Sequence, residues 1–283
     1  MAKFKKCLLA VVLSFIAILA INPLQVQAKN PSLVKLKLGK IYTKYDVTGD
    51  KRNDKVKITQ QKIDEYEYSY KLYVSINGKK HTLTNKWGFF DVNPSIVTLK
   101  NGKTYLWIQG FGDDDSDPFM CLYQYKGRKL LKAVTFSSNG QANYAAPGRT
   151  DITKISGNTI TVKQNAMSTP LGVMGYSYNY TYKNGKIVKK SNIGKILWVA
   201  FDNGKQSRTG VLKNTKTLYT SPSFKKKVMS IKAGQRATAT EINITKNMIS
   251  VKLKIKNGKS GWVKCSKTYN DKNLIFRNCF YAG

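Results

Sequence analysis

The sequence predicts an all-β protein made of antiparallel strands, and two observations support that prediction. Runs in which apolar and polar residues alternate recur along the chain, with the period of two that a half-buried strand requires. Many runs are separated by dipeptides that favour β-hairpin turns, such as Asn77-Gly78, Asn101-Gly102, Gly157-Asn158 and Asn184-Gly185. The uneven spacing of these turns argues against a propeller or a solenoid. We therefore expect an antiparallel β-sandwich or irregular barrel of roughly 160 residues, followed by a smaller barrel.

Residues 1–28 have the features of a signal peptide. Three lysines precede an apolar run from Cys7 to Ile21, and Val26-Gln27-Ala28 forms a small-residue cleavage site. The alternative is a retained membrane anchor, but the run is shorter than the roughly 20 residues that span a bilayer. We therefore expect a secreted protein, extracellular or associated with the cell wall, with no stable membrane span after cleavage.

The next segment, residues 29–195, is expected to form the larger β-domain. It begins with an alternating strand at Val34, Leu36 and Leu38, and the alternation resumes at Val56. Five hairpins follow in order, with strands at 70–76 and 79–83, 95–99 and 104–108, 122–125 and 130–136, 150–155 and 159–163, and 176–182 and 186–189. No helix is predicted in this part of the chain.

A short loop from Asp46 to Asp54 joins two of the expected strands and carries oxygen atoms at regular spacing. The candidate metal ligands are the side chains of Asp46, Thr48, Asp50 and Asp54, together with the backbone carbonyl of Arg52. Calcium takes six to eight oxygen ligands, and a short loop can supply them in this order. The loop therefore predicts calcium as a cofactor, and the alternative is a metal-free turn rich in Asx side chains.

This loop resembles the calcium loops of dockerins and of FG-GAP propeller repeats, through Asp46, Thr48, Gly49, Asp50 and Asp54. It departs from EF-hand-like loops at Lys51, where their sharp turn has glycine, and at Lys57, where an EF-hand has a bidentate glutamate. Both departures are expected to weaken calcium binding.

The chain is strongly basic, with 49 Lys and Arg residues against 15 Asp and Glu residues. Removing the three lysines of the signal peptide leaves 46 against 15, a net charge of +31. Such an excess attracts polyanions, and outside a cell these are teichoic acids, anionic lipids and acidic polysaccharides rather than nucleic acid. Lysine greatly outnumbers arginine, which suits diffuse attraction. The alternative is that the lysines only keep the surface soluble.

Cysteine and histidine are too scarce for several kinds of catalytic site. His81 is the only histidine, and it is expected to be an exposed strand residue. With one histidine the chain is not expected to form a Cys/His or a His-rich metal site. Cys121, Cys265 and Cys279 remain after export. Cys265 and Cys279 could pair in an oxidising compartment, or all three could be buried thiols.

Three segments of the first domain interrupt the hairpin pattern. Residues 113–117 hold four acids and could complete a metal site, or form a solvated acidic loop. Residues 142–148 and 165–175 are predicted loops that could line a groove for sugar with Tyr144, Tyr176 and Tyr178. The alternative for these tyrosines is packing in the core or across strands.

The chain changes character after a predicted linker at 196–210, in which the apolar run 196–201 is expected to be partly strand. Residues 211–283 carry a distinct set of turn residues. They are Leu218, Pro222, Gly234, Gly258, Gly261, Trp262 and Val263. Their order resembles the bacterial SH3-like domain, whose last hairpin closes with Gly-Trp-Val. Leu253 stands where the family has valine, and Thr217 and Tyr219 stand near its usual arginine and asparagine.

The resemblance implies a small barrel that binds the cell wall, with Tyr219 and Trp262 as the candidate ligand-binding residues. The expected partners are peptidoglycan or anionic wall polymers. Residues 205–283 support this through charge, because eighteen Lys and Arg residues face two acids, a net charge of +16. We therefore expect a non-enzymatic exported cell-envelope protein.

Two alternatives remain open. One is a wall hydrolase with a catalytic N-terminal domain, which would need two facing carboxylates from among Asp91, Asp113, Asp115 and Asp151. The other is a calcium-dependent adhesin that binds carbohydrate.

Overall fold

The protein is built almost entirely from antiparallel strands, as the sequence predicts. The fold comes from a computed structural model that describes residues 30–62, 70–83, 91–111, 119–136 and 145–281. Within these ranges there is no α-helix, only a short 3-10 turn at Asp271–Asn273, and no helix has the length and hydropathy needed to cross a membrane. The predicted signal peptide lies outside the described residues.

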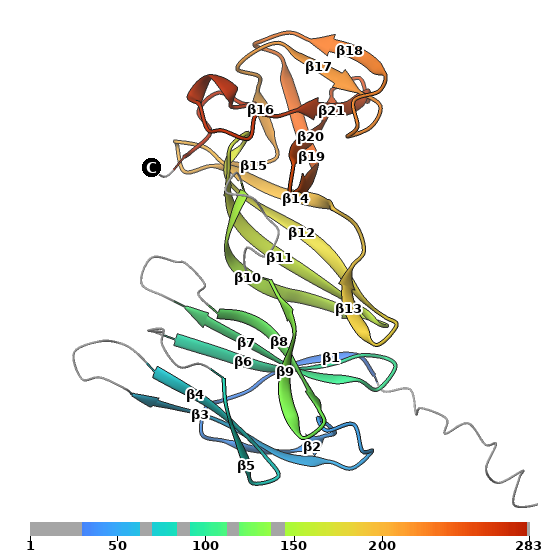
Figure 1. The fold of residues 1–283 in the computed structure, drawn as a ribbon. Helices are drawn as coiled ribbons and strands as arrows, with labels where there is room; N and C mark the ends of the chain where they lie inside the picture. Colours follow the sequence, from blue (N-terminus) through green and yellow to red (C-terminus); the bar gives the residue numbers. More distant parts are fainter. Residues whose placement is uncertain (1–29, 63–69, 84–90, 112–118, 137–144, 282–283) are drawn as a thin grey trace, which may run out of the picture.

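The strands form three sheets, which follow one another along an elongated molecule (Figure 1). The four-stranded sheet has the order β2-β3-β4-β5 and consists of β2 (Ile41–Tyr45), β3 (Asp54–Lys62), β4 (Tyr70–Ile76) and β5 (Lys79–Thr82). The five-stranded sheet has the order β1-β6-β7-β8-β9 and consists of β1 (Ser32–Lys35), β6 (Asp91–Thr98), β7 (Thr104–Phe111), β8 (Phe119–Lys126) and β9 (Lys129–Thr135).

The third sheet has twelve strands and continues to the C-terminal end of the molecule. Its main order is β10-β11-β12-β14-β19-β20-β21-β17-β18, with β13, β15 and β16 paired at its sides. Its strands are β10 (Ala145–Ser156), β11 (Thr159–Ser168), β12 (Gly172–Lys183), β13 (Lys186–Lys189), β14 (Ile193–Ala200), β15 (Gln206–Ser207), β16 (Thr209–Val211), β17 (Lys216–Tyr219), β18 (Lys227–Ile231), β19 (Arg236–Thr245), β20 (Met248–Ile255) and β21 (Ser260–Lys264).

The five predicted hairpins are present as β4–β5, β6–β7, β8–β9, β10–β11 and β12–β13. Their turns explain why short local signals identified them. Asn77 and Gly78 both have positive φ, of 50° and 84°, and Asn184 and Gly185 repeat this with 50° and 79°. Two successive left-handed residues give the turn whose twist matches the flanking strands.

The five-stranded sheet is the middle layer and buries both of its faces. On one face, Ile96, Leu106 and Ile108 pack against Val56 and Ile58 of the four-stranded sheet. The opposite face packs on β10 to β13 with a second set of buried side chains, among them Leu99, Tyr105, Trp107, Leu122, Ile160 and Val162. Strand β7 therefore has the nearly continuous apolar run of a strand that is covered on both sides.

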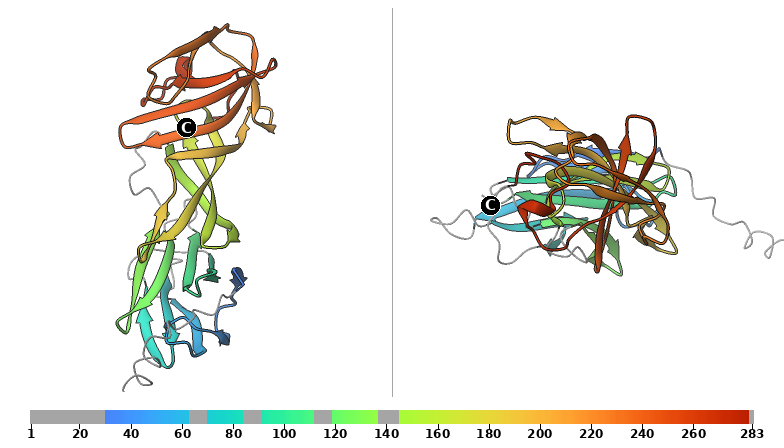
Figure 2. Two further views of the ribbon diagram at one scale, coloured as in Figure 1. Left: turned by 90° about the vertical axis from the view of Figure 1, so that its right-hand side faces the viewer. Right: turned by 90° about the horizontal axis from the view of Figure 1, so that it is seen from above.

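The segment 196–210 is partly strand, as its apolar run predicts: residues 196–200 belong to β14, and β15 is Gln206–Ser207. Strand β14 pairs with β12 through Met174–Ser177 and with β19 through Asn243, Ile242 and Glu241. Ile196 and Val199 are fully buried in the same core as the C-terminal strands. An apolar run that alternates over several residues can bury one face, so this segment extends the sheet and joins the two halves (Figure 2).

The predicted loop at 165–175 is largely strand. Asn165 to Ser168 belongs to β11 and Gly172 to Gly175 belongs to β12, so only a tight connection lies between them. Tyr176 and Tyr178 are 0% and 2% exposed, which confirms core packing over a sugar-binding face. Tyr144 and the acidic segment 113–117 lie outside the described residues.

Candidate functional site

The carboxylate of Asp54 holds the start of the predicted calcium loop. Asp54 is 1% exposed. Its Oδ2 accepts hydrogen bonds from the backbone amides of Val47 (2.6 Å) and Thr48 (2.8 Å). Its Oδ1 accepts from the side-chain amide of Asn77, at 2.6 Å, in the β4–β5 turn. Both carboxylate oxygens are therefore engaged by the protein itself, and the loop is tied to the neighbouring hairpin.

The other two carboxylates of the loop also accept backbone amides. Asp46 Oδ1 accepts from Gly49 N at 2.6 Å, and Oδ2 accepts from Lys51 N at 3.0 Å. Asp50 Oδ1 accepts from Arg52 N at 2.8 Å. Lys51 has a φ of +72°, so it takes the left-handed conformation that glycine provides in EF-hand-like loops, at a cost of about 1 kcal/mol.

These contacts form the Asx-rich turn that the sequence leaves as the alternative to a calcium site. Among the described residues, no three His, Cys, Asp or Glu side chains lie close enough to hold a metal ion. The three predicted carboxylate ligands, Asp46, Asp50 and Asp54, instead accept hydrogen bonds from protein groups in this conformation. Calcium binding by this loop stays a prediction, and its test is given below.

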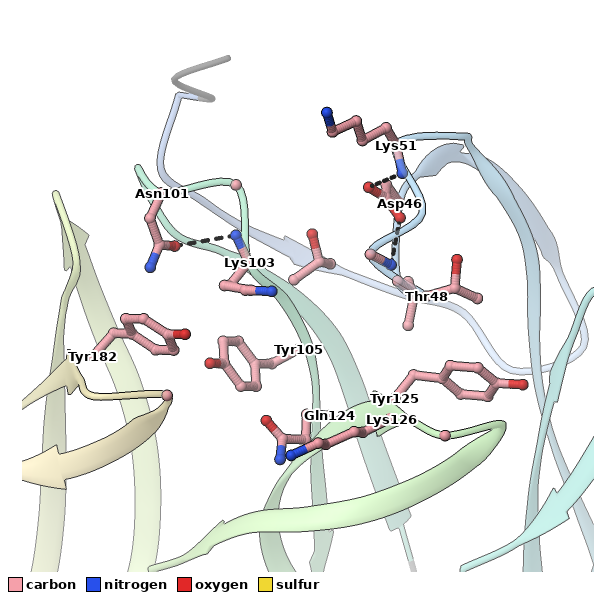
Figure 3. Close-up of a pocket in the computed structure, with 16 residues that line it drawn as sticks. Asp46, Thr48, Lys51, Asn101, Lys103, Tyr105, Gln124, Tyr125, Lys126 and Tyr182 are labelled. Carbon is pink, nitrogen blue, oxygen red and sulfur yellow. Dashed lines mark hydrogen bonds between the residues drawn. The ribbon is translucent and has the colours of Figure 1, made fainter. Parts of the chain in front are cut away.

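The loop nevertheless forms one wall of a pocket of about 780 Å³, at the place where the three sheets meet (Figure 3). We call it the three-sheet pocket. Asp46 to Gly49 and Lys51 form the wall from the four-stranded sheet. Asn101 to Tyr105 and Gln124 to Gly127 come from the five-stranded sheet, and Tyr182 and Gly185 come from the β12–β13 hairpin. The sequence contains each of these turns, but nothing in their local pattern indicates that they converge.

The three-sheet pocket is lined by hydroxyl, amide and ammonium groups. Tyr105 and Tyr182 point toward each other across it (Figure 3). Burial raises the pKa of Tyr105, with a smaller contribution from Tyr182, so the Tyr105 phenol stays protonated at physiological pH. Lys103 and Lys126 are exposed at its edge. Such a lining can bind a polar ligand, and it contains no nucleophile with an adjacent base.

The two predicted ligand-binding residues lie side by side in the C-terminal strands but differ in accessibility. Tyr219 of β17 pairs with Trp262 of β21. Trp262 is only 4% exposed, so its ring is largely unavailable to a ligand. Tyr219 is half-buried, and its ring packs edge-on against Phe224 at 5.4 Å. Of the two residues, Tyr219 is therefore the one that a ligand could contact.

The turn residues that carry the SH3-like resemblance have clear roles in this part of the fold. Gly234 and Gly258 have φ of 83° and 85°, the left-handed conformation that glycine adopts without strain. Gly261 lies against β17 with no room for a side chain. Leu218 and Leu253 are fully buried. The strands follow the antiparallel order β16-β19-β20-β21-β17-β18.

The C-terminal part presents most of its positive charge to solvent. Of the eighteen Lys and Arg residues in 205–283, fifteen are exposed, and Lys213, Lys216 and Lys252 are half-buried. Its described ion pairs join Lys213 to Asp271 and Lys252 to Glu241. Since these pairs use the region's two acids, the remaining cations are available to an anionic partner.

The cysteines and the histidine have surroundings that suit structural roles. Cys121, Cys265 and Cys279 are free thiols. Burial raises the pKa of both Cys265 and Cys279 to about 12, which keeps them protonated and unreactive. His81 lies on β5 as expected, but it is half-buried against Tyr125, with the ring centroids 5.6 Å apart. Burial and the nearby Lys79 lower its pKa.

The carboxylates considered for a hydrolase are only partly described. Asp151 Oδ1 accepts from the side-chain amide of Gln109 at 3.1 Å, and Arg149 lies 4.0 Å from its other oxygen. Asp91 accepts from the amide of Val92 at 2.8 Å. Asp113 and Asp115 lie outside the described residues. Each described carboxylate thus has a structural partner.

Comparison with known proteins identifies no relative of this chain. A scan against protein-family models finds no match, and searches of curated proteins and of solved structures find no similar protein.

Proposed function

We propose that the protein is a non-enzymatic, exported cell-envelope protein whose C-terminal strands, β16 to β21, bind the cell wall through its anionic polymers. The observation that carries this proposal is the exposed positive charge of residues 205–283, fifteen solvent-facing cations with two acids in the whole region. A partner with dense negative charge would gain electrostatic attraction over the whole of such a surface.

The kind of cation supports binding by diffuse attraction. Of the eighteen Lys and Arg residues in 205–283, fifteen are lysines and three are arginines. A lysine ammonium acts as a mobile point charge, without the planar fork that arginine uses for bidentate phosphate recognition. Lys225, Lys226 and Lys227 form the densest group, and all three are exposed. A polymer with repeated phosphate or carboxylate groups fits this surface better than one compact anionic ligand does.

The resemblance to the bacterial SH3-like domain supports the same role, because that family binds cell walls. Because Trp262 is buried, we expect an aromatic groove to contribute little to wall binding. We expect Tyr219 to add an apolar contact at most, and the lysines to provide most of the affinity. Binding should therefore weaken as salt is added, since exposed charges are screened beyond about 8 Å at physiological ionic strength.

The test is co-sedimentation of the mature chain, residues 29–283, with purified cell walls across a range of salt concentrations. The full chain is needed because β14 belongs to a sheet that joins both halves. A triple variant with Lys225, Lys226 and Lys227 changed to Gln should bind several-fold more weakly at low salt and should lose less affinity on salt addition.

The matched control removes three exposed lysines from the other half of the chain: Lys55, Lys79 and Lys129. Equal weakening by both triple variants would mean that total charge alone matters and that the C-terminal strands have no special role. Walls stripped of teichoic acid identify the polymer, because binding that survives stripping assigns peptidoglycan as the partner. If the mature chain does not sediment with native walls at low salt, the proposal is wrong.

A further inference from the structure

The three-sheet pocket lies in the half of the molecule that the proposed function does not use. Its walls come from three sheets, and every residue that lines it belongs to the described part of the chain. Its volume of about 780 Å³ falls within the range of pockets that bind small organic ligands, roughly 300–1,000 Å³.

The turns around the three-sheet pocket are fixed to one another by hydrogen bonds. Asn158 connects two of its walls: its side-chain oxygen accepts from the amide of Asn101 at 2.9 Å, and its backbone carbonyl accepts from the amide of Tyr182 at 3.0 Å. Asp54 holds Val47 and Thr48 on the third wall. A pocket whose walls are positioned before a ligand arrives loses less entropy on binding.

The charges in the three-sheet pocket favour an anionic ligand. Lys51, Lys103 and Lys126 are exposed lining residues, and Asp46 is the one carboxylate among the residues that line it. Asp46 is only 7% exposed and accepts two backbone amides of its own loop, so little of its carboxylate faces a ligand. Lys51 extends away from the pocket, whereas Lys126 lies beside Gln124 (Figure 3).

The neutral groups favour a ligand with many hydroxyls. The phenol of the half-buried Tyr182 can donate and accept a hydrogen bond, and so can the side-chain amide of Gln124. Asn101 uses its side-chain oxygen on the amide of Lys103 at 3.1 Å, which leaves its NH₂ group to donate. The half-buried ring of Tyr182 also offers an apolar face to a sugar ring.

We propose that the three-sheet pocket binds an anionic saccharide unit, a sugar that carries a carboxylate or a phosphate group. Lys103 and Lys126 would attract the anionic group, while Tyr182 and the two amides would bind hydroxyls, and the buried Tyr105 would form the floor of the pocket. This site is independent of the wall-binding surface on β16 to β21, so either proposal can fail without the other.

The test is calorimetric titration of the mature chain with defined probes at a fixed ionic strength of about 0.15 M, where diffuse attraction is reduced. The probes are a tetrasaccharide that contains uronic acid, a phosphorylated disaccharide, a neutral tetrasaccharide of the same size and an acidic hexapeptide. We expect one of the charged saccharides to bind at least about tenfold more tightly than the neutral one, and the preferred probe identifies the anionic group.

Two variants separate this site from the general basicity of the chain. Lys126→Gln should weaken binding about three- to tenfold, whereas Lys129→Gln, the matched loss of an exposed charge across the same hairpin, should change it less than about twofold. Tyr182→Phe removes one hydroxyl and no charge, and it should also weaken binding about three- to tenfold. Its wall sedimentation should equal that of the parent chain.

Three results would overturn the proposal. One is that neither charged saccharide binds at millimolar concentration. Another is that Lys126→Gln and Lys129→Gln have equal effects, or that Tyr182→Phe has none, because binding would then be diffuse. The third is that the acidic hexapeptide binds more tightly than both saccharides, which would assign the pocket to a peptide.

Discussion

Gly261 gives the sharpest test of how the C-terminal strands are held together. A Cβ atom at this position would lie 2.8 Å from the Cβ of Leu218, 2.9 Å from the carbonyl oxygen of Tyr219 and 3.2 Å from its amide nitrogen. Two of these atoms belong to the backbone, and Leu218 is fully buried. Gly261→Ala therefore has no flexible neighbour that can move aside, and β17 and β21 must separate.

The expected cost follows from the kind of clash. Inserting a methyl group into a packed site costs about 1–3 kcal/mol, and loss of the backbone pairing between Tyr219 and Trp262 adds about 1 kcal/mol. We expect Gly261→Ala to lower the free energy of unfolding by about 2–4 kcal/mol. Urea denaturation of the mature chain measures it, and hydrogen exchange should locate the loosened amides in β17 and β21.

Two neighbouring variants serve as controls. Gly258 has a φ of +85° and no atom within 4 Å of an added Cβ, so Gly258→Ala should cost only the left-handed strain of about 1–2 kcal/mol. Ser260 is exposed, and Ser260→Ala should stay within about 0.5 kcal/mol of the parent chain. If Gly261→Ala is no more destabilising than Ser260→Ala, the close approach of the two strands is not what this glycine permits.

Two further predictions concern single side chains. If the Asp46–Asp54 loop binds calcium, the melting temperature should rise with calcium through a weak site that Asp50→Ala abolishes; identical melting with calcium and with chelator would establish the metal-free turn. Burial lowers the pKa of Lys189 to about 8, so the folded state binds fewer protons than the unfolded state between about pH 8 and 10.5 and stability should rise with pH across that window. Its ammonium lies 3.3 Å from the centre of the Tyr178 ring, which favours the charged form, so we expect Lys189→Met to gain only about 1 kcal/mol at pH 7. The variant should also lose the rise between about pH 8 and 10.5, and an unchanged slope in urea titrations over that range would contradict this.

The hairpins could be predicted because their information is local. Asn77-Gly78 and Asn184-Gly185 specify left-handed turns, and the alternating residues beside them specify strands. The same reasoning failed at residues 165–175, where Gly, Pro and Met suggested a loop. That stretch is buried on the sheet beside the C-terminal strands, and such burial depends on segments distant in sequence.

In the predicted linker, the apolar run indicates a strand but does not indicate which strands pair with it. Residues 196–210 lie between two stretches of different character, and a boundary there is a fair reading of composition. Yet the buried face of Ile196 and Val199 is covered by strands that come later in the chain, such as β19. A change in composition near residue 196 therefore does not mark the end of the sheet, because β14 forms hydrogen bonds with both β12 and β19.

The loop from Asp46 to Asp54 illustrates why the chemistry of a site is harder to predict than its place. Its spacing of oxygen atoms correctly locates a tight connection between β2 and β3, because both a calcium loop and an Asx-rich turn require it. The two structures differ only in whether the carboxylates face an ion or the backbone amides. In this conformation Asn77 engages Asp54 from another hairpin, and the left-handed backbone of Lys51 lets its amide reach Asp46. Calcium binding by the loop stays a prediction.

The three-sheet pocket follows from the same kind of long-range contact. Asn158 belongs to the β10–β11 turn, yet it bonds to Asn101 in the β6–β7 turn and to Tyr182 at the end of β12. Each turn is encoded beside its own strands, and only the stacking of sheets on both faces of β7 brings the turns together. A site built in this way combines side chains from distant parts of the sequence on walls that are each rigid, which is the arrangement a specific binding pocket needs.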